Sequence, residues 1–243
     1  MLIYGINPVL EALRAKRVTL LSVASRADDR LSALLRLAEE QGVAVRRVND
    51  KELERAARGA AHQGVVAEVE AAAHLSVEDL VTGAAGAPLI VVLDGIEDPH
   101  NLGAILRTVD AAGADGVVRQ SRHAAPLGGA AAKASAGAVA HVRIAEVVNI
   151  ARALETLKEA GVWTVGLAGD ADTAYETIDF TLPTAIVVGA EGAGMRRLVR
   201  ERCDWVVSIP MQGQVASLNV SVATGIVLFE AVRQRRAASS TSD

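Results

Sequence analysis

The stretch from Pro88 to Gly103 reads PLIVVLDGIEDPHNLG and decides the fold class. Its first half, Leu89–Ile96, is an apolar run apart from Asp94 near its end, which is typical of a parallel strand buried on both faces. The sequence then turns polar and leads into a segment with helical spacing of apolar residues, residues 101–112, which Gly113 ends. A buried strand followed by a polar turn and a helix predicts an α/β domain with a mainly parallel sheet.

The same alternation continues toward the C-terminus. Further strands are expected at residues 114–118, 162–168, 184–190 and 205–211, with helices at 149–160 and 217–236. The pattern therefore predicts one α/β domain over residues 88–237. The last residues, 238–243, are small and polar, and we expect a disordered tail there.

The N-terminal part predicts a second, smaller α/β domain over residues 1–70. Strands are expected at 20–25, 43–48 and 64–70, and helices at 8–15, 31–41 and 51–58. Residues 71–87 are rich in Ala and Gly, so we interpret them as a linker that includes a short helix.

Composition restricts the kind of partner that the chain can bind. Of its 243 residues, 51% are hydrophobic and 22% charged, which is enough for packed cores, and the net charge is −4. A general nucleic-acid binder would be basic, so any RNA contact must use local patches. Two candidates stand out, although paired arginines are more often a solvated face: Arg14, Lys16 and Arg17, and Arg46 with Arg47.

The single cysteine, Cys203, cannot form an internal disulfide, which indicates a reducing compartment. The N-terminal sequence lacks the basic and apolar regions of a signal peptide, and no apolar run reaches the roughly 20 residues that cross a bilayer. The five histidines have no metal-ligand spacing. We therefore expect a cytoplasmic protein without a membrane segment or a metal.

Three polar segments follow predicted strands, where ligands bind in open parallel sheets. The first contains Asn101, placed where a helix would be capped, and Arg107 two turns later. The second, VVGAEGAGMRR, holds Glu191 among three glycines. The third, from Ile209 to Gly225, has Ser217 and Asn219 at the start of the last helix. Each segment also has a plain structural interpretation, as a helix cap or a glycine turn.

The glycine-rich segment does not match the common nucleotide-binding motifs. Its spacing is GxxGxG rather than GxGxxG, no GK[ST] follows, and Glu191 would repel a pyrophosphate. This disfavours a nucleotide-dependent oxidoreductase. A carboxylate in such a turn suits a neutral or cationic ligand, or one with hydroxyl donors. Ser135 in KASAGA is better explained by close packing than as a nucleophile.

Together the three segments resemble the motifs of the SpoU (TrmH-type) family of RNA 2′-O-ribose methyltransferases. NLGAILRT is similar to its motif 1, VVGAEGAGM to motif 2 and IPMQGQVASLNVSVATGIVLFE to motif 3, in the same order and spacing. At the other end of the chain, YGINPVLEALRA and HQGVVAEV resemble the small RNA-binding domain of this family, which is akin to ribosomal protein L30e.

The resemblance implies a SPOUT fold with a deep trefoil knot in the C-terminal domain, and a homodimer whose active site lies near the subunit interface. It also implies S-adenosyl-L-methionine as cofactor, held by knot loops around Gly189, Ile209 and Leu218. The polar active-site residues of the family fall on Asn101, Arg107, Glu191 and Asn219, with Ser217 beside them.

Within this family, the chain resembles the members that methylate a guanosine of 23S rRNA in the peptidyl-transferase region, either as free RNA or in an assembling large ribosomal subunit. One alternative is a methyltransferase acting on tRNA or at another ribosomal site. Another is a non-catalytic RNA-binding protein of ribosome assembly. For Arg107 we expect a role in stabilising the developing alkoxide or holding the adjacent phosphate, because a guanidinium is a poor base. Asn101 would then orient it, and Glu191 would either pair with it or accept a hydrogen bond from a hydroxyl group.

Overall fold

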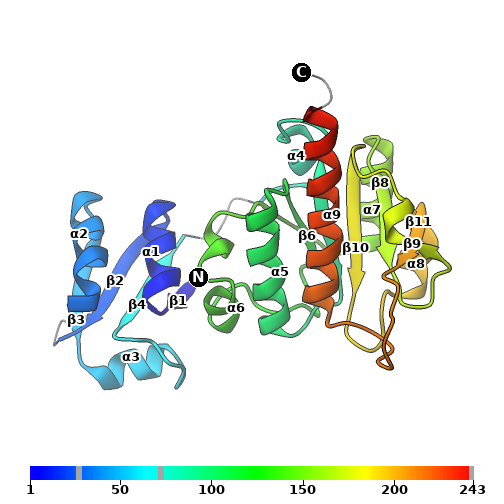
Figure 1. The fold of residues 1–243 in the computed structure, drawn as a ribbon. Coiled ribbons are helices and arrows are strands. Elements are labelled where there is room, and N and C mark those ends of the chain that lie inside the picture. Colours follow the sequence, from blue (N-terminus) through cyan, green and yellow to red (C-terminus); the bar gives the residue numbers. More distant parts are fainter. Residues whose placement is uncertain (26–28, 71–73, 241–243) are drawn as a thin grey trace. The chain divides into compact units, whose positions relative to one another are not determined.

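The computed structural model describes residues 1–25, 29–70 and 74–240, and it divides into two compact units (Figure 1). The smaller unit consists of Met1–Ala73 together with Leu102–Arg107 and Pro126–His141. The larger unit holds the remaining segments, His74–Asn101, Thr108–Ala125 and Val142–Asp243. The predicted domain limits stay predictions, and three residues of the predicted linker, 71–73, lie outside the described residues.

The larger unit is built on a seven-stranded sheet in the order β7-β6-β5-β10-β8-β11-β9. Every pairing of neighbouring strands in it is parallel, which confirms the predicted sheet type. The strands are β5 (Leu89–Asp94), β6 (Gly116–Gln120), β7 (Ile144–Val147), β8 (Trp163–Leu167), β9 (Thr173–Ala174), β10 (Thr184–Gly189) and β11 (Trp205–Ser208).

The central strands β5 and β10 are buried along their whole length, as the apolar runs predict. Their register pairs Thr184 with Leu89 and Gly189 with Asp94, so both strands end side by side. One face of the sheet packs on α4 (Val77–Thr82), α7 (Ile150–Glu159) and α8 (Arg197–Arg202). On the other face, α9 (Val220–Ser240) packs against β10 (Figure 1).

The helix after β5, α5 (Pro99–Ala112), begins two residues earlier than predicted. Its N-cap is Asp98, whose carboxylate accepts a 2.7 Å hydrogen bond from the backbone N–H of His100. Asn101 is therefore not the cap. Pro99 fits the first helical position because its missing N–H would have no partner there. The buried Asn101 side chain is consequently available for contacts with other segments.

The ends of several elements differ from the sequence prediction, most clearly those of β6 and α9. Strand β6 runs to Gln120, past the predicted end at 118, and both of its last residues, Arg119 and Gln120, are buried. Helix α9 starts at Val220 and continues to Ser240. Residues 238–240 of the predicted tail are thus helical, and residues 241–243 lie outside the described part of the chain.

The smaller unit contains a four-stranded sheet in the order β1-β4-β2-β3. Strand β4 (Val65–Val69) is antiparallel to both β1 (Leu2–Tyr4) and β2 (Val18–Ala24), whereas β3 (Ala44–Val48) is parallel to β2. The other elements of this unit are helices α1 (Ile6–Arg14), α2 (Ser32–Glu40), α3 (Asp50–Ala56) and α6 (Ala130–Ala134), with 3₁₀ turns at Asp29–Leu31 and Ala138–Ala140. The three residues of β1 are too few to give a periodic signal.

Part of the predicted basic patches is engaged inside this unit. Arg17 donates to the carbonyl groups of Glu70, Val139 and Ala140 at 3.2–3.3 Å, which ties β2 to the segment after α6. Arg46 pairs with Glu52 at 2.5 Å. Arg17 therefore has a structural role here. Among the described residues, no helix has the length and apolar character needed to cross a bilayer.

The end of α9 is fastened to the sheet by Arg235. Its guanidinium donates four hydrogen bonds of 2.6–3.1 Å to main-chain carbonyl groups, those of Ala87, Pro88, Phe180 and Leu182. These carbonyls flank the starts of β5 and β10, so Arg235 holds α9 on the sheet at the edge opposite to the strand ends. Hydrogen bonds from a charged group contribute more than neutral ones.

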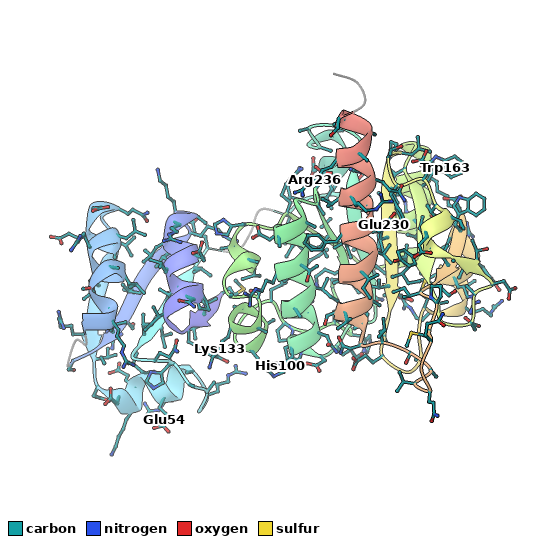
Figure 2. All side chains as sticks on the ribbon, viewed as in Figure 1. Glu54, His100, Lys133, Trp163, Glu230 and Arg236 are labelled. Atoms are coloured by element: carbon teal, nitrogen blue, oxygen red, sulfur yellow. The ribbon has the colours of Figure 1, made fainter. Side chains whose placement is uncertain are left out.

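We expect Arg235→Met to lower the free energy of unfolding by about 2 kcal/mol, because the carbonyl groups lose a charged donor. The matched control is Arg236→Met, at the neighbouring exposed position labelled in Figure 2, which should change stability by less than about 0.5 kcal/mol. Urea unfolding followed by circular dichroism measures both. Equal stability of the two variants would contradict this role.

Candidate active site

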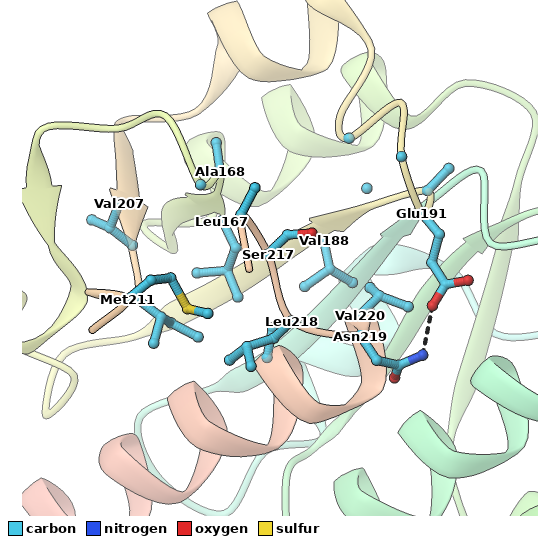
Figure 3. Close-up of a pocket in the computed structure, with 18 residues that line it drawn as sticks. Leu167, Ala168, Val188, Glu191, Val207, Met211, Ser217, Leu218, Asn219 and Val220 are labelled. Carbon is cyan, nitrogen blue, oxygen red and sulfur yellow. Dashed lines mark hydrogen bonds between the residues drawn. The ribbon is translucent and has the colours of Figure 1, made fainter. Parts of the chain in front are cut away.

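The side-chain amide of Asn219 joins three separate segments of the larger unit. Its Nδ2 donates to Asn101 Oδ1 at 2.9 Å. The same nitrogen donates to Glu191 Oε1 at 2.5 Å, the bond drawn in Figure 3. Its Oδ1 accepts from the backbone N–H of Ser221 at 2.9 Å and from its hydroxyl at 2.6 Å. Both donors and both lone pairs of the amide are thus used. Three of the predicted site residues meet at this point.

The loop after β10 makes a tight turn that places Glu191. Ala190 and Gly194 exchange two backbone hydrogen bonds of 3.1 and 2.8 Å across it. Gly192 and Gly194 have φ values of 74° and 67°, in the left-handed region that favours glycine. Gly189 is needed for another reason, because a Cβ atom there would lie 2.1 Å from the carbonyl carbon of Gly194. The glycines therefore serve the close approach of one backbone to another.

A cavity of about 390 Å³ opens between this turn, the ends of β8 and β11, and the start of α9 (Figure 3). Its walls are mainly apolar, with Glu191, Ser217 and Asn219 as the polar side chains. The three residues predicted to bind a cofactor, Gly189, Ile209 and Leu218, all line it. The other apolar lining residues include Leu167, Val188, Val207 and Met211. Its size is within the range of small-molecule sites.

Arg107 makes no hydrogen bond to this group of side chains. It is exposed on α5, and its guanidinium has no hydrogen bond or ion pair with any residue that the structure describes. Because each residue advances about 100° around an α-helix, Arg107 points about 120° away from Asn101 on the same helix. In this single chain, Asn101 and Glu191 bind Asn219 instead of orienting Arg107.

An ion pair that no sequence motif indicates lies at the end of β5. Asp94, 1% exposed, accepts from the backbone N–H and the Nε of Arg196, both at 2.7 Å, and its Oδ1 lies 2.6 Å from Arg196 Nη2. When the Gln120 amide is turned with its oxygen toward Arg196, it accepts from both Nη atoms at 3.1 Å. Asp94 thus anchors the far side of the glycine turn. The sequence did carry one indication of this residue, because Asp94 is the charged residue that ends the buried strand β5.

A second cavity, of about 560 Å³, adjoins the first and shares Ala190, Glu191, Gly194 and Val220 with it. More of its lining residues carry polar side chains, and they come from the ends of β5 and β6, the loops that follow these strands and the glycine turn after β10. The polar side chains that line it are those of Asp94, Glu97, Asp98, Asn101, Gln120, His123, Glu191 and Arg196. The site therefore consists of two neighbouring cavities that meet at Glu191.

The residues that form this arrangement lie in a segment that is similar to a known protein family. The SpoU rRNA Methylase family matches residues 88–229, which include both cavities. The chain belongs to the SpoU family. A second family, described as RNA 2′-O ribose methyltransferase substrate binding, matches residues 2–75. The two matches together cover nearly the whole chain.

Individual members of the family are similar over their full length. The chain is 47% identical to the 23S rRNA (guanosine-2′-O-)-methyltransferase RlmB of Photobacterium profundum, over 97% of this chain and 98% of that protein. Among solved structures, the SpoU methyltransferase AviRb of Streptomyces viridochromogenes in complex with AdoMet is 28% identical with a TM-score of 0.81, and the match covers 98% of this chain and 91% of that one. A TrmH/SpoU tRNA modifying enzyme of A. aeolicus is 34% identical with a TM-score of 0.57, and covers 63% of this chain and 78% of its own.

We expect Gly189→Ala to lower the free energy of unfolding by more than about 2 kcal/mol, since its Cβ would meet backbone atoms that cannot move aside without opening the turn. The control is Gly213→Ala, in a nearby loop where a Cβ meets nothing within 4 Å. Thermal and urea unfolding of both variants measure the difference. A Gly189→Ala protein as stable as the Gly213→Ala protein would show that the turn tolerates a side chain.

Proposed function

We propose that this protein transfers a methyl group from S-adenosyl-L-methionine to the ribose 2′-hydroxyl of a guanosine in 23S rRNA, in the cytoplasm. The observation that carries the proposal is the junction of an apolar cavity with the bonded side chains of Asn101, Glu191 and Asn219. The 47% identity to an RlmB enzyme over nearly the full length supports the reaction and the substrate. The trefoil knot and the L30e-like character of the N-terminal domain remain part of this proposal.

The first cavity fits S-adenosylmethionine in size and chemistry. Apolar walls that include Ile209 and Leu218 suit an adenine ring, and Gly189 lets the backbone come close. Glu191 is the charged side chain that lines the cavity, and a carboxylate suits a ligand with a positive sulfonium. The cofactor supplies a methyl group on that sulfonium when it is bound. A cofactor bound in the first cavity would have Glu191 at the side where the second cavity begins.

The residues of the polar group have distinct tasks in this reaction. Asn219 is a positioning residue, because it uses all its hydrogen-bonding capacity on Asn101, Glu191 and Ser221. Glu191 has a second carboxylate oxygen, Oε2, that can accept the hydrogen bond of a ribose hydroxyl. Holding the hydroxyl oxygen in line with the methyl group accounts for much of the rate. Ser217 lines the same cavity and adds a hydroxyl at its rim.

We further propose that the active unit is a homodimer and that Arg107 acts in the site of the second copy. Arg107 is exposed and points away from Asn101 on α5, so its own chain gives it no described partner. Helix α9 exposes Val222 and Phe229, seven residues apart on one side of the helix, and each is 49% exposed. A second copy would cover this apolar side. Arg107 then stabilises the developing alkoxide or holds the adjacent phosphate.

The N-terminal unit helps to distinguish between the alternative substrates. The A. aeolicus tRNA modifying enzyme aligns with only 63% of this chain, whereas the RlmB match extends through the substrate-binding residues 2–75. This favours ribosomal RNA over tRNA. The retained set of Asn101, Glu191 and Asn219, bonded to one another, weighs against a non-catalytic ribosome-assembly protein.

The proposed function is tested by methyl transfer from labelled S-adenosylmethionine to unmodified 23S rRNA and to assembling large subunits, with tRNA as a parallel substrate. We expect label at a single guanosine of the peptidyl-transferase region, mapped by cleavage that is sensitive to ribose methylation. Label on tRNA alone would replace the substrate. Cofactor binding without label on any RNA would favour the non-catalytic alternative.

Arg107→Ala and Glu191→Gln should each reduce methyl transfer by at least about a hundredfold, since the first removes a group that stabilises developing charge and the second weakens the acceptor that aligns the ribose hydroxyl. Because Arg107 serves the other copy, co-expression of the two variants, which produces hybrid dimers, should restore a substantial part of the wild-type rate. Hybrid dimers then contain one intact site. No restoration in hybrids shown to form by size and tag capture would contradict action across the interface.

A further inference from the structure

The second cavity is placed to receive the base of the nucleoside whose ribose is methylated. It adjoins the first cavity at Glu191, where the ribose hydroxyl would lie. A base is joined to the same ribose, so it must occupy space next to that point and outside the first cavity. The second cavity, of about 560 Å³ and with several polar side chains in an otherwise apolar lining, is such a space. This reasoning rests on the proposed function.

Most polar groups of this cavity are already engaged within the protein. Asp94 accepts three close contacts from Arg196. Asp98 caps α5 through the backbone of His100. Asn101 accepts from Asn219. These groups shape the wall, and a ligand would have to compete with their existing bonds.

Two side chains of the lining make no hydrogen bond or ion pair at all within the described chain, those of Glu97 and His123. Both are exposed. One is a carboxylate that only accepts hydrogen bonds, and the other is an imidazole that can donate one. The cavity therefore offers one strong acceptor and one donor from two different loops.

The loops that carry these two side chains are tied to each other. Arg119 donates to the carbonyl oxygen of Ala125 at 2.6 Å, and the backbone N–H of Ala125 donates to Ile96 at 3.0 Å. Ile96 directly precedes Glu97. On the other side of His123, the backbone N–H of Ser121 donates to Val147 at 2.9 Å. The His123 loop is thus held at both ends, and one of these ends is held against the Glu97 loop.

Two further features of this loop are costly for a purely structural segment. Arg119 is 4% exposed, burial lowers the pKa of its guanidinium, and its Nη1 has no hydrogen-bond partner among the described residues. His123 has a φ of 50°, a left-handed conformation that is uncommon outside glycine. Residues held in such conformations cluster at functional sites. The hydrogen bond from the buried Arg119 and the left-handed backbone at His123 together define the course of the loop that carries this exposed imidazole.

We propose that this cavity binds the guanine base of the target nucleoside, with Glu97 accepting from its N1–H and 2-amino groups and His123 donating to N7. Guanine presents two adjacent donors on its Watson–Crick edge, which match a carboxylate. Adenine presents an unprotonated N1 there, which a carboxylate repels. Proteins read unpaired RNA bases by hydrogen bonds to these edges. The pair of side chains therefore selects guanosine over adenosine.

The test pairs each protein variant with a change in the base. Substrates are the RNA fragment around the guanosine mapped in the methyl-transfer assay, carrying guanosine, inosine or 7-deazaguanosine at that position. Inosine lacks the 2-amino group, and 7-deazaguanosine lacks the N7 acceptor. The variants are Glu97→Gln and His123→Gly, since glycine accepts the φ of 50° without strain. The control is Arg122→Ala, in the same loop at an exposed position outside the cavity lining.

The wild-type protein should lose about tenfold in single-turnover rate with either altered base, the discrimination expected for base-edge contacts. Glu97→Gln should lose about tenfold with guanosine, show little further loss with inosine, and keep the full loss with 7-deazaguanosine. His123→Gly should show the opposite pattern. Any loss in Arg122→Ala should be the same for all three RNAs. Such crossed dependence is the signature of a direct contact.

Other results would overturn the inference. If Glu97→Gln and His123→Gly lose the same factor with every base, or lose nothing, the base is read elsewhere. Unfolding temperature and S-adenosylmethionine affinity of each variant check that it is folded, and Glu97→Ala and His123→Asn replace a variant that is not. Failure of the proposed function looks different, because the wild-type protein itself would then methylate no guanosine, and the inference would fall with it.

Discussion

The amide of Asn219 is the point at which the functional half of this protein is held together. It bonds to Asn101 at the start of α5, to Glu191 in the glycine turn, and to Ser221 in the first turn of α9. Only a side chain with two donors and two acceptor lone pairs can do this, and an aspartate would place a second carboxylate beside Glu191. The relative positions of the two cavities depend on this single group.

The parallel sheet brings these segments together because its central strands end at one edge. Asp94 and Gly189 are partners in the register of β5 and β10, so the loops after them start side by side. Asp94 then holds Arg196 beyond the turn, while the lack of a side chain at Gly189 lets the turn fold back on its own strand. The apolar core fixes the strand ends, and a few polar contacts convert that edge into a site.

Much of the fold could be predicted from the sequence, because buried parallel strands such as β5 and β10 are mainly apolar runs. Local rules failed where polar residues continue an element, as at Arg119 and Gln120 in β6. The cap of α5 was placed at Asn101 instead of Asp98, since both residue types suit that position. Each of the three motifs contributes one residue to the bonded group of Asn101, Glu191 and Asn219, whereas Arg107 of the first motif is not bonded to it.

The partners of those side chains could not be predicted in the same way. Asn219 and Asn101 are 118 residues apart, and no local spacing reports their hydrogen bond. The side of α5 on which Arg107 lies, relative to Asn101, becomes clear only from the folded helix. The tie between Ala125 and Ile96, which joins the two loops of the second cavity, likewise follows only from the folded sheet.

The position of β10 between β5 and β8 also affects how the chain reaches this state. Leu89 pairs with Thr184. During translation, β5 therefore leaves the ribosome roughly a hundred residues before its neighbour β10 does. Until then one side of a mainly apolar strand has no partner, and such non-local pairing is slow. During synthesis there is therefore a period in which β5, which later positions the site, has one unpaired edge that can associate with other chains. The strand order itself thus requires that this edge be protected until β10 has been made.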